Sequence, residues 1–298
     1  MKFIKNNCLL CEEKTEVKHV YSQNLPKKIV DVDYSGRKKP DNFHYEMVRC
    51  LRCGLLFASE IYDNQTITDL YKDSEFEYFQ ELDGLVKTYS SLFKYISFYN
   101  VSKDNFLDIG CANGFLIKEA KKFGFANVNG SEISLKAINS AHKSVKDSIM
   151  QGPFNQKNYS ENFFDVVFFA MIIEHFENPN KFLKDVYKIL KPGGLLIGIT
   201  HDEKNFLSRL LKNKHPIIND EHISVFDKMT LKNIIKKNNF EILNVENLKN
   251  YYSIEYWLMM TPIYDFIKKI SLSVLKLLKL NKKIIGVKAG NIYIIARK

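Results

Sequence analysis

Four of the five cysteines in the chain stand in two closely spaced pairs. Cys8 and Cys11 form one C-x-x-C motif, Cys50 and Cys53 form a second, and 38 residues separate them. Each motif can place two thiolates on one turn, and two such turns complete the tetrahedral four-sulfur site that suits zinc. Such a site leaves no position open for a substrate, so we expect one structural zinc ion that stabilises a segment too small and polar to fold alone. Four unrelated buried cysteines are the alternative. Three nearby basic side chains could offset the charge of the thiolates: Lys14, Arg49 and Arg52.

A second stretch that could bind a ligand or take part in chemistry is residues 106–115, F-L-D-I-G-C-A-N-G-F. An apolar run that reads as a buried strand ends at Asp108, glycines follow at 110 and 114, and apolar residues then recur at helical spacing. Glycine lets the backbone turn tightly and approach a small molecule, and the next helix presents unpaired N–H groups to it. The dinucleotide fingerprint G-x-G-x-x-G is absent, because Ala112 and Phe115 stand where it requires glycine. The stretch predicts a small-molecule site of another kind.

More polar residues follow the next predicted strands. A strand over residues 127–131 ends at Glu132, 24 residues after Asp108. The strand F-F-D-V-V-F-F-A is followed by Glu174 and His175, then by N-P opening a helix, K-P-G-G and the strand L-L-I-G-I-T. Alternating strands and helices form a doubly wound sheet that binds its ligand at the carboxyl ends of the strands.

From residue 105 to residue 200 this order and spacing resemble the class I S-adenosylmethionine (SAM) methyltransferases, with residues 108–114 as their motif I in the form D-x-G-x-x-x-G. The resemblance implies that SAM is the cofactor and that Glu132 accepts hydrogen bonds from both hydroxyls of its ribose. A carboxylate that merely caps the next helix is the alternative for Glu132. The resemblance implies cofactor contacts for nine residues: Asp108, Gly110, Cys111, Ala112, Gly114, Phe115, Glu132, Ile133 and Ala170. After the third strand the family commonly has an acidic residue near the adenine; this chain departs from that pattern and has Phe154, which could pack on the base.

The resemblance also places candidate catalytic residues after the fourth strand. Methyl transfer often requires the removal of one proton from the acceptor, and His175 is the leading base because its ordinary pKa lies near working pH. Glu174 could orient it, and His222 is a third candidate for contact with the acceptor. A structural histidine that bonds the backbone is the alternative for His175. Two further polar residues are expected near the same sheet edge: His201 and Glu221.

Two groups of methyltransferases carry a similar E-H pair. Some quinone-pathway O-methyltransferases have E-x-x-E-H and bind a divalent metal with it; Met171 replaces the first acidic residue here and argues against that metal site. The C-methyltransferases of nucleotide-linked deoxysugars begin with a zinc-binding cysteine domain and use the histidine as base. Those enzymes are longer, so only the combination of zinc segment and E-H carries over.

The resemblance implies that the elements positioning these residues form an α/β fold. We expect a doubly wound seven-stranded SAM-methyltransferase sheet with an N-terminal zinc ribbon and a C-terminal helical insertion. Residues 1–60 are the zinc-ribbon segment, 61–104 an aromatic helical linker or lid, 105–249 the SAM-binding core, 250–288 an amphipathic insertion and 289–298 the last, antiparallel strand. In the aromatic segment, Leu85, Tyr89, Leu92, Phe93 and Ile96 predict a packed helix face. Three aromatic residues there could instead cover the site: Tyr71, Tyr78 and Phe79.

The composition is that of an ordinary globular protein, with 45% hydrophobic and 26% charged residues. The net charge of +10 suggests nucleic acid as a partner, but only five of the 44 basic residues are arginine, the residue favoured for phosphate and base recognition. We therefore expect a small-molecule acceptor, specifically a nucleotide-linked or lipid-linked sugar of a surface polysaccharide. An RNA methyltransferase and a non-catalytic SAM-binding module are the alternatives.

Residues 263–282 predict an amphipathic helix with one apolar face and many lysines. This face could lie on an anionic membrane, pack on the sheet or bind a second copy in a homodimer. The sequence shows no signal peptide and no apolar run long enough to span a bilayer, and cysteines without export point to a reducing compartment. We therefore expect a cytoplasmic protein, either free or at the inner face of the membrane.

Overall fold

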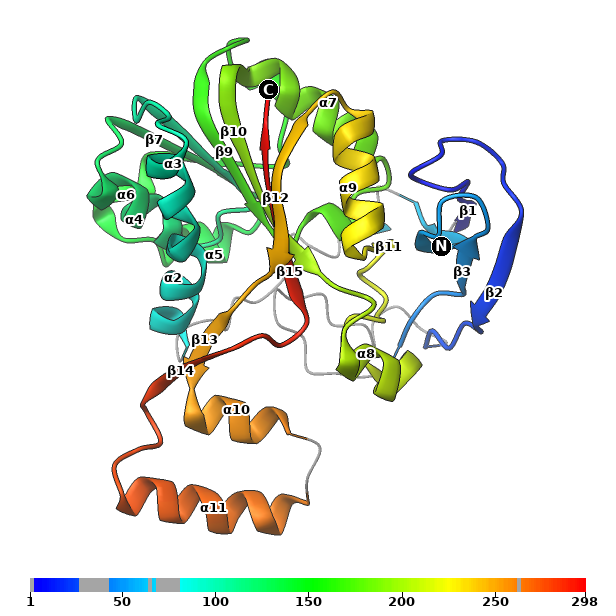
Figure 1. Ribbon diagram of the computed structural model, residues 1–298, viewed down its shortest axis with the longest axis vertical. Coiled ribbons are helices and arrows are strands. Elements are labelled where there is room, and N and C mark those ends of the chain that lie inside the picture. The colour runs from blue at the N-terminus through cyan, green and yellow to red at the C-terminus, as the bar shows by residue number, and fades with distance from the viewer. Residues whose placement is uncertain (1–2, 27–42, 64–65, 68–80, 262–263) are drawn as a thin grey trace.

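The computed structural model describes residues 3–26, 43–63, 66–67, 81–261 and 264–298. Its centre is a seven-stranded sheet in the order β12-β15-β10-β9-β6-β7-β8 (Figure 1). The strands from β10 to β8 run parallel, whereas β15 is antiparallel to both β10 and β12. The predicted seven-stranded sheet with an antiparallel last strand is confirmed. The strands are β6 Asn105–Ile109, β7 Asn127–Glu132, β8 Ile149–Gln151, β9 Phe164–Ala170, β10 Leu190–His201, β12 Glu241–Asn247 and β15 Asn291–Arg297.

Helices cover both faces of this sheet because its central strands are apolar at successive positions. Neighbouring side chains point to opposite faces: Phe106 and Phe168 pack with η2, α3 and α4, whereas Leu107 and Phe169 pack with α7 and α9. The helices are α2 Leu82–Ser90, η2 Ser91–Phe93, α3 Lys94–Phe98, α4 Phe115–Phe123, α5 Leu135–Asn139, α6 Lys143–Lys146, η3 Gln156–Asn158, η4 Ile173–His175, α7 Pro179–Ile189, α8 Phe206–Leu211, η5 Lys212–Lys214 and α9 Lys228–Lys237.

The N-terminal part joins this core instead of forming one of its own. Its four-stranded sheet has the order β11-β4-β3-β2, and β11 comes from residues 224–225, far along the chain. One continuous apolar cluster contains both Leu10 and Tyr45 from this part and Phe182 from α7. A segment too small for its own core is thus stabilised by burial against the larger one. The strands are β1 Phe3–Lys5, β2 Val17–Tyr21, β3 Met47–Cys50, β4 Leu56–Ala58, β5 Glu60–Tyr62 and β11 Ser224–Val225, with β1 paired to β5.

The aromatic segment packs on the sheet as its spacing predicts. Leu85, Leu92, Phe93 and Ile96 are buried, and the Tyr89 ring lies 5.7 Å from that of Phe115. The three aromatic residues that could cover the site lie outside the described residues: Tyr71, Tyr78 and Phe79.

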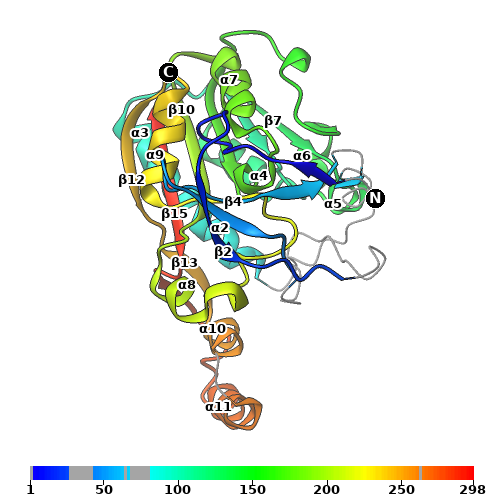
Figure 2. The same cartoon turned by 90° about the vertical axis from the view of Figure 1, so that its right-hand side faces the viewer.

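The insertion after β12 contains two strands as well as two helices. Strands β13 Asn250–Ser253 and β14 Ile284–Val287 pair in antiparallel fashion and support α10 Ile254–Met260 and α11 Asp265–Leu277. Both views show the two helices extending beyond the rest of the protein (Figures 1 and 2). The apolar face of α11 does not pack on the sheet, which corrects one of the three options that the sequence left open. In the part of the chain that the structure describes, no helix has the length and apolar character needed to cross a membrane.

Candidate functional site

The loop after β6 is a tight turn between a buried strand and a helix. Gly110, Ala112 and Gly114 all have positive φ angles, of 73°, 51° and 70°. The N–H groups of Gly110 and Cys111 both donate to the Ser131 carbonyl at 2.9 and 3.1 Å, which fixes the loop to the end of β7. Helix α4 then begins at Phe115, with Gly114 as its N-cap. This arrangement can present backbone N–H groups to a polar ligand.

Glu132 connects this loop to the next strand end. Its Oε2 accepts a hydrogen bond from the Ala112 N–H at 2.9 Å, and its Oε1 accepts one from the Ser134 N–H at 2.8 Å. The cap of α5 is the Ser134 side chain, which accepts from the Ala137 N–H, so Glu132 is not the capping side chain. Each carboxylate oxygen retains a lone pair and could still accept a ribose hydroxyl.

Two buried acidic groups lie together at this edge. Burial raises the pKa of Glu132, and the N–H groups of Ser134 and Ala112 oppose that shift. Burial raises the pKa of Asp108 well above its usual range, and the Glu132 charge adds to this effect. A cation placed beside these groups would lower both pKa values, whereas an anion would raise them further.

The other predicted cofactor residues surround the same edge. Cys111 is buried under the loop, and a Cβ added to Gly130 would lie 2.6 Å from its Sγ. Ile133 and Ala170 are partly buried at the ends of β7 and β9. Phe154 packs on the rings of Tyr159 and Phe182, at centroid distances of 6.0 and 5.8 Å. The assignment of these residues to the cofactor stays a prediction.

The segment after β9 packs directly against the loop after β6. A Cβ added to Gly110 would lie only 2.7 Å from Cγ2 of Ile172, so the two segments touch where glycine leaves room. Met171 occupies the left-handed region with φ of 55°, which is unusual for a non-glycine residue. This sharp turn directs the chain into η4 and carries Glu174 and His175 to the carboxyl edge of the sheet.

The carboxyl group of Glu174 is buried, and one of its two oxygens accepts a hydrogen bond. Its Oε2 accepts a hydrogen bond from the Thr200 hydroxyl at 2.9 Å, whereas its Oε1 has no hydrogen-bond partner among the described residues. Nε2 of His201 lies 3.8 Å from Oε1. Burial raises the pKa of Glu174 to about 7, opposed by hydrogen bonds from its own backbone and from Thr200.

Three histidines surround this carboxyl group. The rings of His175 and His222 lie 4.8 Å apart, and those of His201 and His222 lie 5.3 Å apart. Nδ1 of each ring faces an oxygen acceptor: the carbonyl of Glu221 for His175, the carbonyl of Ile217 for His222 and Oδ1 of Asn291 for His201. These contacts fix the orientation of each ring and assign the proton of the neutral ring to Nδ1.

Burial keeps all three histidines neutral near pH 7. It lowers the pKa of His175 to about 4, although the carbonyls of Glu221 and Met171 oppose the shift. Burial lowers the pKa of His201 to about 4 as well, with Asn291 in opposition. For His222 the pKa falls well below its usual range, because burial and repulsion from the other two rings act together.

The same cluster has a donor set that some metal ions use. Ligand atoms of Glu174, His175 and His222 lie within 4.8 Å of one another. A carboxylate with two imidazoles is a common set for a divalent transition metal. Met171 removes an acidic ligand from the local E-x-x-E-H motif, but the fold brings His222 from a distant segment to Glu174 and His175.

The four paired cysteines form a second cluster, in the N-terminal part. The Sγ atoms of Cys8 and Cys53 lie 3.4 Å apart, those of Cys11 and Cys50 lie 3.9 Å apart, and all four lie within 4.8 Å. A tetrahedral ion with Zn–S bonds of about 2.3 Å requires sulfur atoms about 3.8 Å apart, so the donor set fits zinc.

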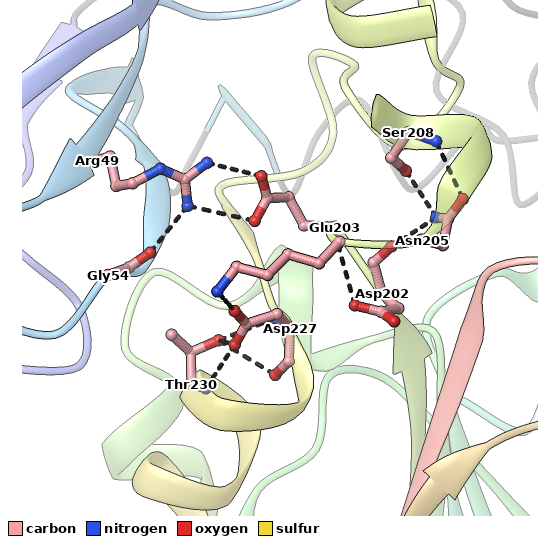
Figure 3. A network of polar contacts seen from close by, with 9 residues as sticks. Arg49, Gly54, Asp202, Glu203, Asn205, Ser208, Asp227 and Thr230 are labelled. Carbon is pink, nitrogen blue, oxygen red and sulfur yellow. Dashed lines mark hydrogen bonds and ion pairs between the residues drawn. The ribbon is translucent and has the colours of Figure 1, made fainter. Parts of the chain in front are cut away.

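The basic residues near these cysteines contact carboxylates. Both terminal nitrogens of Arg49 donate to Glu203, at 3.2 and 2.6 Å, and one also donates to the Gly54 carbonyl at 2.9 Å (Figure 3). Arg52 pairs with Glu13. The expectation that these arginines offset thiolate charge therefore overlooked partners contributed by the fold, and the Arg49–Glu203 pair fastens β3 to the segment after β10.

A hollow of about 320 Å³ opens beside this ion pair. Its lining includes the basic side chains of Lys204, Arg209 and Lys212, together with Ile217. Lys204 pairs with Asp227, the N-cap of α9, while Arg209 and Lys212 are exposed. Because the Ile217 carbonyl bonds His222, one wall of the hollow adjoins the histidine cluster. Sequence reasoning missed this hollow, since its residues follow no recognisable spacing.

A family model described as "Methyltransferase domain" matches residues 79–245, which contain the loop, Glu132 and the E-H segment. The chain belongs to the methyltransferase domain family. The sheet order and the antiparallel last strand of this methyltransferase domain fit the class I SAM-dependent fold.

Curated relatives match only part of this methyltransferase. The ubiquinone biosynthesis O-methyltransferase of Caulobacter vibrioides is 34% identical over 111 residues, which are 36% of this chain and 42% of that protein. The mitochondrial enzyme of the same name from Dictyostelium discoideum is 33% identical over 119 residues, 35% of this chain and 37% of the relative. The matches thus span about two fifths of the length of these relatives. A solved SAM-dependent methyltransferase from Archaeoglobus fulgidus is 16% identical, with a TM-score of 0.48 over 79% of this chain and 100% of that structure.

Proposed function

We propose that this methyltransferase transfers the methyl group of SAM to a small-molecule acceptor, an activated sugar used to build a surface polysaccharide. The observation that carries the proposal is the contact between Ile172 and Gly110, which brings the histidine cluster to the cofactor loop. A group that can accept a proton therefore lies beside the place where a methyl donor would bind.

His175 is the proposed base. When bound, SAM supplies a methyl group whose bond to the sulfonium sulfur breaks as the acceptor atom attacks, which leaves S-adenosylhomocysteine. The acceptor atom loses one proton as its new bond forms, and His175 takes it. The ring is neutral at pH 7 and can accept a proton. Burial lowers its pKa to about 4, and the carbonyls of Glu221 and Met171 offset part of this destabilisation of the imidazolium. The positive charge lost from sulfur offsets the charge gained by the ring.

Glu174 and His222 act mainly by positioning in this proposal. Glu174 is held by the Thr200 hydroxyl, and Nε2 of His201, whose ring is neutral at pH 7, lies 3.8 Å from its second oxygen. His222 packs edge-on against His175 and limits its rotation. The cofactor is assigned to the loop residues 108–115 and to the carboxylate of Glu132, which is already held by two N–H groups.

The choice of an activated sugar is supported by charge. The hollow near His222 is lined by Glu203, which pairs with Arg49, and by Lys204, which pairs with Asp227. Its lining also includes two exposed basic side chains, Arg209 and Lys212. A nucleotide-linked or lipid-linked sugar carries a diphosphate, which such side chains bind well. The four-cysteine cluster adds support through the resemblance to zinc-containing sugar methyltransferases, and we assign it one structural zinc ion.

The test is to follow the methyl group. Purified protein is incubated with methyl-labelled SAM and an extract of its own cells, and the label is divided among RNA, low-mass and lipid-linked fractions. We expect label in a low-mass or lipid-linked sugar, whose mass spectrum identifies the methylated atom. Label in RNA would favour an RNA methyltransferase, and label in a quinone or its phenolic precursor would favour the reaction named for the curated relatives. SAM binding without any label would favour a non-catalytic module.

A paired variant tests the hollow. Arg209→Ala with Lys212→Ala should raise the KM for the acceptor about tenfold or more while leaving SAM affinity unchanged, because both side chains lie away from residues 108–115. The control is Lys232→Ala with Lys236→Ala on exposed positions of α9, which removes the same charge elsewhere. An equal rise in both variants would contradict a diphosphate subsite.

A further inference from the structure

The insertion between β12 and β15, which contains β13, α10, α11 and β14, is called the helical hairpin below. It projects from the edge of the sheet that carries the candidate site. Strand β12 runs parallel to β10, so its last residue, Asn247, lies at the carboxyl edge. Strand β15 runs in the opposite direction and begins at that same edge with Asn291. The residues between them therefore project from the carboxyl edge (Figures 1 and 2).

The base of the hairpin is firmly attached to the core. The Thr88 hydroxyl accepts a hydrogen bond from the Tyr251 N–H at 2.8 Å, and the Glu81 carboxylate accepts from both the N–H and the hydroxyl of Ser253. The amide of Asn291 joins the base to the site, since its Nδ2 donates to Asn250 Oδ1 at 3.0 Å and its Oδ1 faces His201. The hairpin thus has a defined direction relative to the histidine cluster.

The outer helix exposes a continuous apolar face. Helix α11 lies against α10, and Lys268 donates to the Met259 carbonyl. Leu272 and Leu275 of α11 are half-buried. The side chains on its other side recur at spacings of three and four residues and form what we call the docking face: Phe266 (63% exposed), Ile270 (61%), Val274 (51%) and Leu277 (83%). Large apolar side chains that are this exposed and this aligned mark an interaction surface.

The charges around the docking face identify its partner. Residues 264–288 contain seven lysines and a single acidic residue, Asp265. Two copies of this helix brought face to face would place these lysines near one another, and the repulsion would oppose association. An anionic surface instead gains from each lysine, by about fivefold in affinity per residue.

We propose that the docking face binds the surface of an anionic lipid bilayer, with α11 lying in the plane of the interface. Its apolar side chains enter the acyl boundary while its lysines reach the lipid phosphates. Because the hairpin projects from the carboxyl edge, this attachment turns the candidate site toward the membrane. The proposal is independent of the identity of the acceptor, since it concerns a surface that the methyl-transfer site does not use.

The test is co-sedimentation of the whole protein with vesicles. We expect binding to vesicles of phosphatidylglycerol and phosphatidylcholine at about 50 mM salt, at least tenfold weaker binding to pure phosphatidylcholine, and a loss of binding at about 500 mM salt. Ile270→Ser with Leu277→Ser should reduce binding at least tenfold, and so should Lys269→Glu with Lys276→Glu and Lys279→Glu, three exposed lysines. A matched control reverses three exposed lysines on other elements: Lys143→Glu, Lys157→Glu and Lys184→Glu.

Two outcomes would overturn the proposal. One is the absence of sedimentation with anionic vesicles at low salt, and the other is an equal loss of binding in the matched control. Sedimentation velocity without lipid is measured on the same proteins. A dimer that Ile270→Ser with Leu277→Ser converts to a monomer, without vesicle binding in the parent protein, would assign the face to a second copy instead. Circular dichroism and SAM affinity, which we expect to be unchanged, show that each variant is folded.

Discussion

Ile172 packs on Gly110, so the segment that carries Glu174 and His175 contacts the loop after β6 at a point where only glycine fits. A Cβ at position 110 would lie 2.7 Å from Cγ2 of Ile172, and the backbone there has a φ of 73°. Both halves of the candidate site therefore share one point of contact.

Gly110→Ala should destabilise the protein by about 1–3 kcal/mol, from the positive φ and the steric overlap together. Ile172→Ala removes the overlapping methyl group, so the double variant should recover about 1 kcal/mol relative to the sum of the single effects. Urea unfolding of the four proteins gives this coupling. Strictly additive changes in the free energy of unfolding would show that positions 110 and 172 do not contact each other.

Glu132→Ala should weaken SAM binding by about 1–3 kcal/mol, because it removes the ribose acceptor and leaves two buried N–H groups without a partner. Glu132→Gln is the sharper variant, since its NH₂ group would face one of the N–H groups of Ala112 and Ser134. Isothermal titration calorimetry measures both affinities. SAM binding that neither variant changes would contradict the ribose assignment.

His175→Ala should lower kcat by about 10²–10⁴-fold while leaving SAM affinity nearly intact, which is the usual contribution of a general base. His222→Asn should have a smaller effect on kcat, because that ring contacts His175 without taking the proton. Stopped assays at saturating acceptor give both values. A kcat for His175→Ala within twofold of the parent would remove it as the base.

Glu174→Gln should change stability in a pH-dependent way. Burial raises the pKa of Glu174 to about 7 from an ordinary 4.5, so the folded protein holds this proton more tightly than the unfolded chain does. The group therefore contributes stability that is fully present below about pH 4.5 and is lost as the pH rises toward 7. The loss is on the order of 3 kcal/mol.

Because glutamine cannot lose a proton, the variant should gain stability relative to the parent as the pH rises from about 4.5 to 7, with little further change above that. The three histidines are present in both proteins and cancel in the difference. Denaturant unfolding of both proteins at pH 5 and pH 8 measures this difference in stability. A difference that falls or stays constant across this range would show that Glu174 is not a desolvated carboxyl group.

Purified protein should contain one zinc ion per chain, held by the four cysteines. Cys8→Ser with Cys53→Ser should abolish zinc binding and unfold the N-terminal sheet, because loss of the metal removes folding free energy. Elemental analysis tests this directly. Zinc below about a tenth of one ion per chain, with reduced thiols, would contradict the site.

A second metal ion that survives in the cysteine variant and disappears in Glu174→Gln would place a metal at the histidine cluster.

The sequence predicted most of the methyltransferase core because local patterns determine it. Buried strands such as F-F-D-V-V-F-F-A must lie in a covered sheet, glycine at 110 and 114 permits positive φ, and Asn178 with Pro179 starts a helix. The cysteine spacing likewise anticipates a cluster that the structure forms. Glu132 could be found because an acidic residue at a strand end is local information.

Other features depended on contacts between distant segments, which no local pattern contains. His201 and Thr200 meet Glu174 only because β10 lies beside β9, and His222 joins them because residues 219–223 fold back over η4. Arg49 directly precedes Cys50 in the sequence, yet it pairs with Glu203 from a distant segment, in the region where β11 completes the N-terminal sheet.

Amphipathic spacing alone could determine that α11 has an apolar face, but not what covers that face. That question depends on where the rest of the chain lies, and the paired strands β13 and β14 hold the helix away from the sheet. The sequence by itself thus determined the elements, the loop chemistry and the ligand-type residues, because turns, strand periodicity and helix starts are set within a few neighbours. Only the tertiary structure decided which side chains share a site and which face remains exposed, because burial and pairing are properties of the whole folded chain.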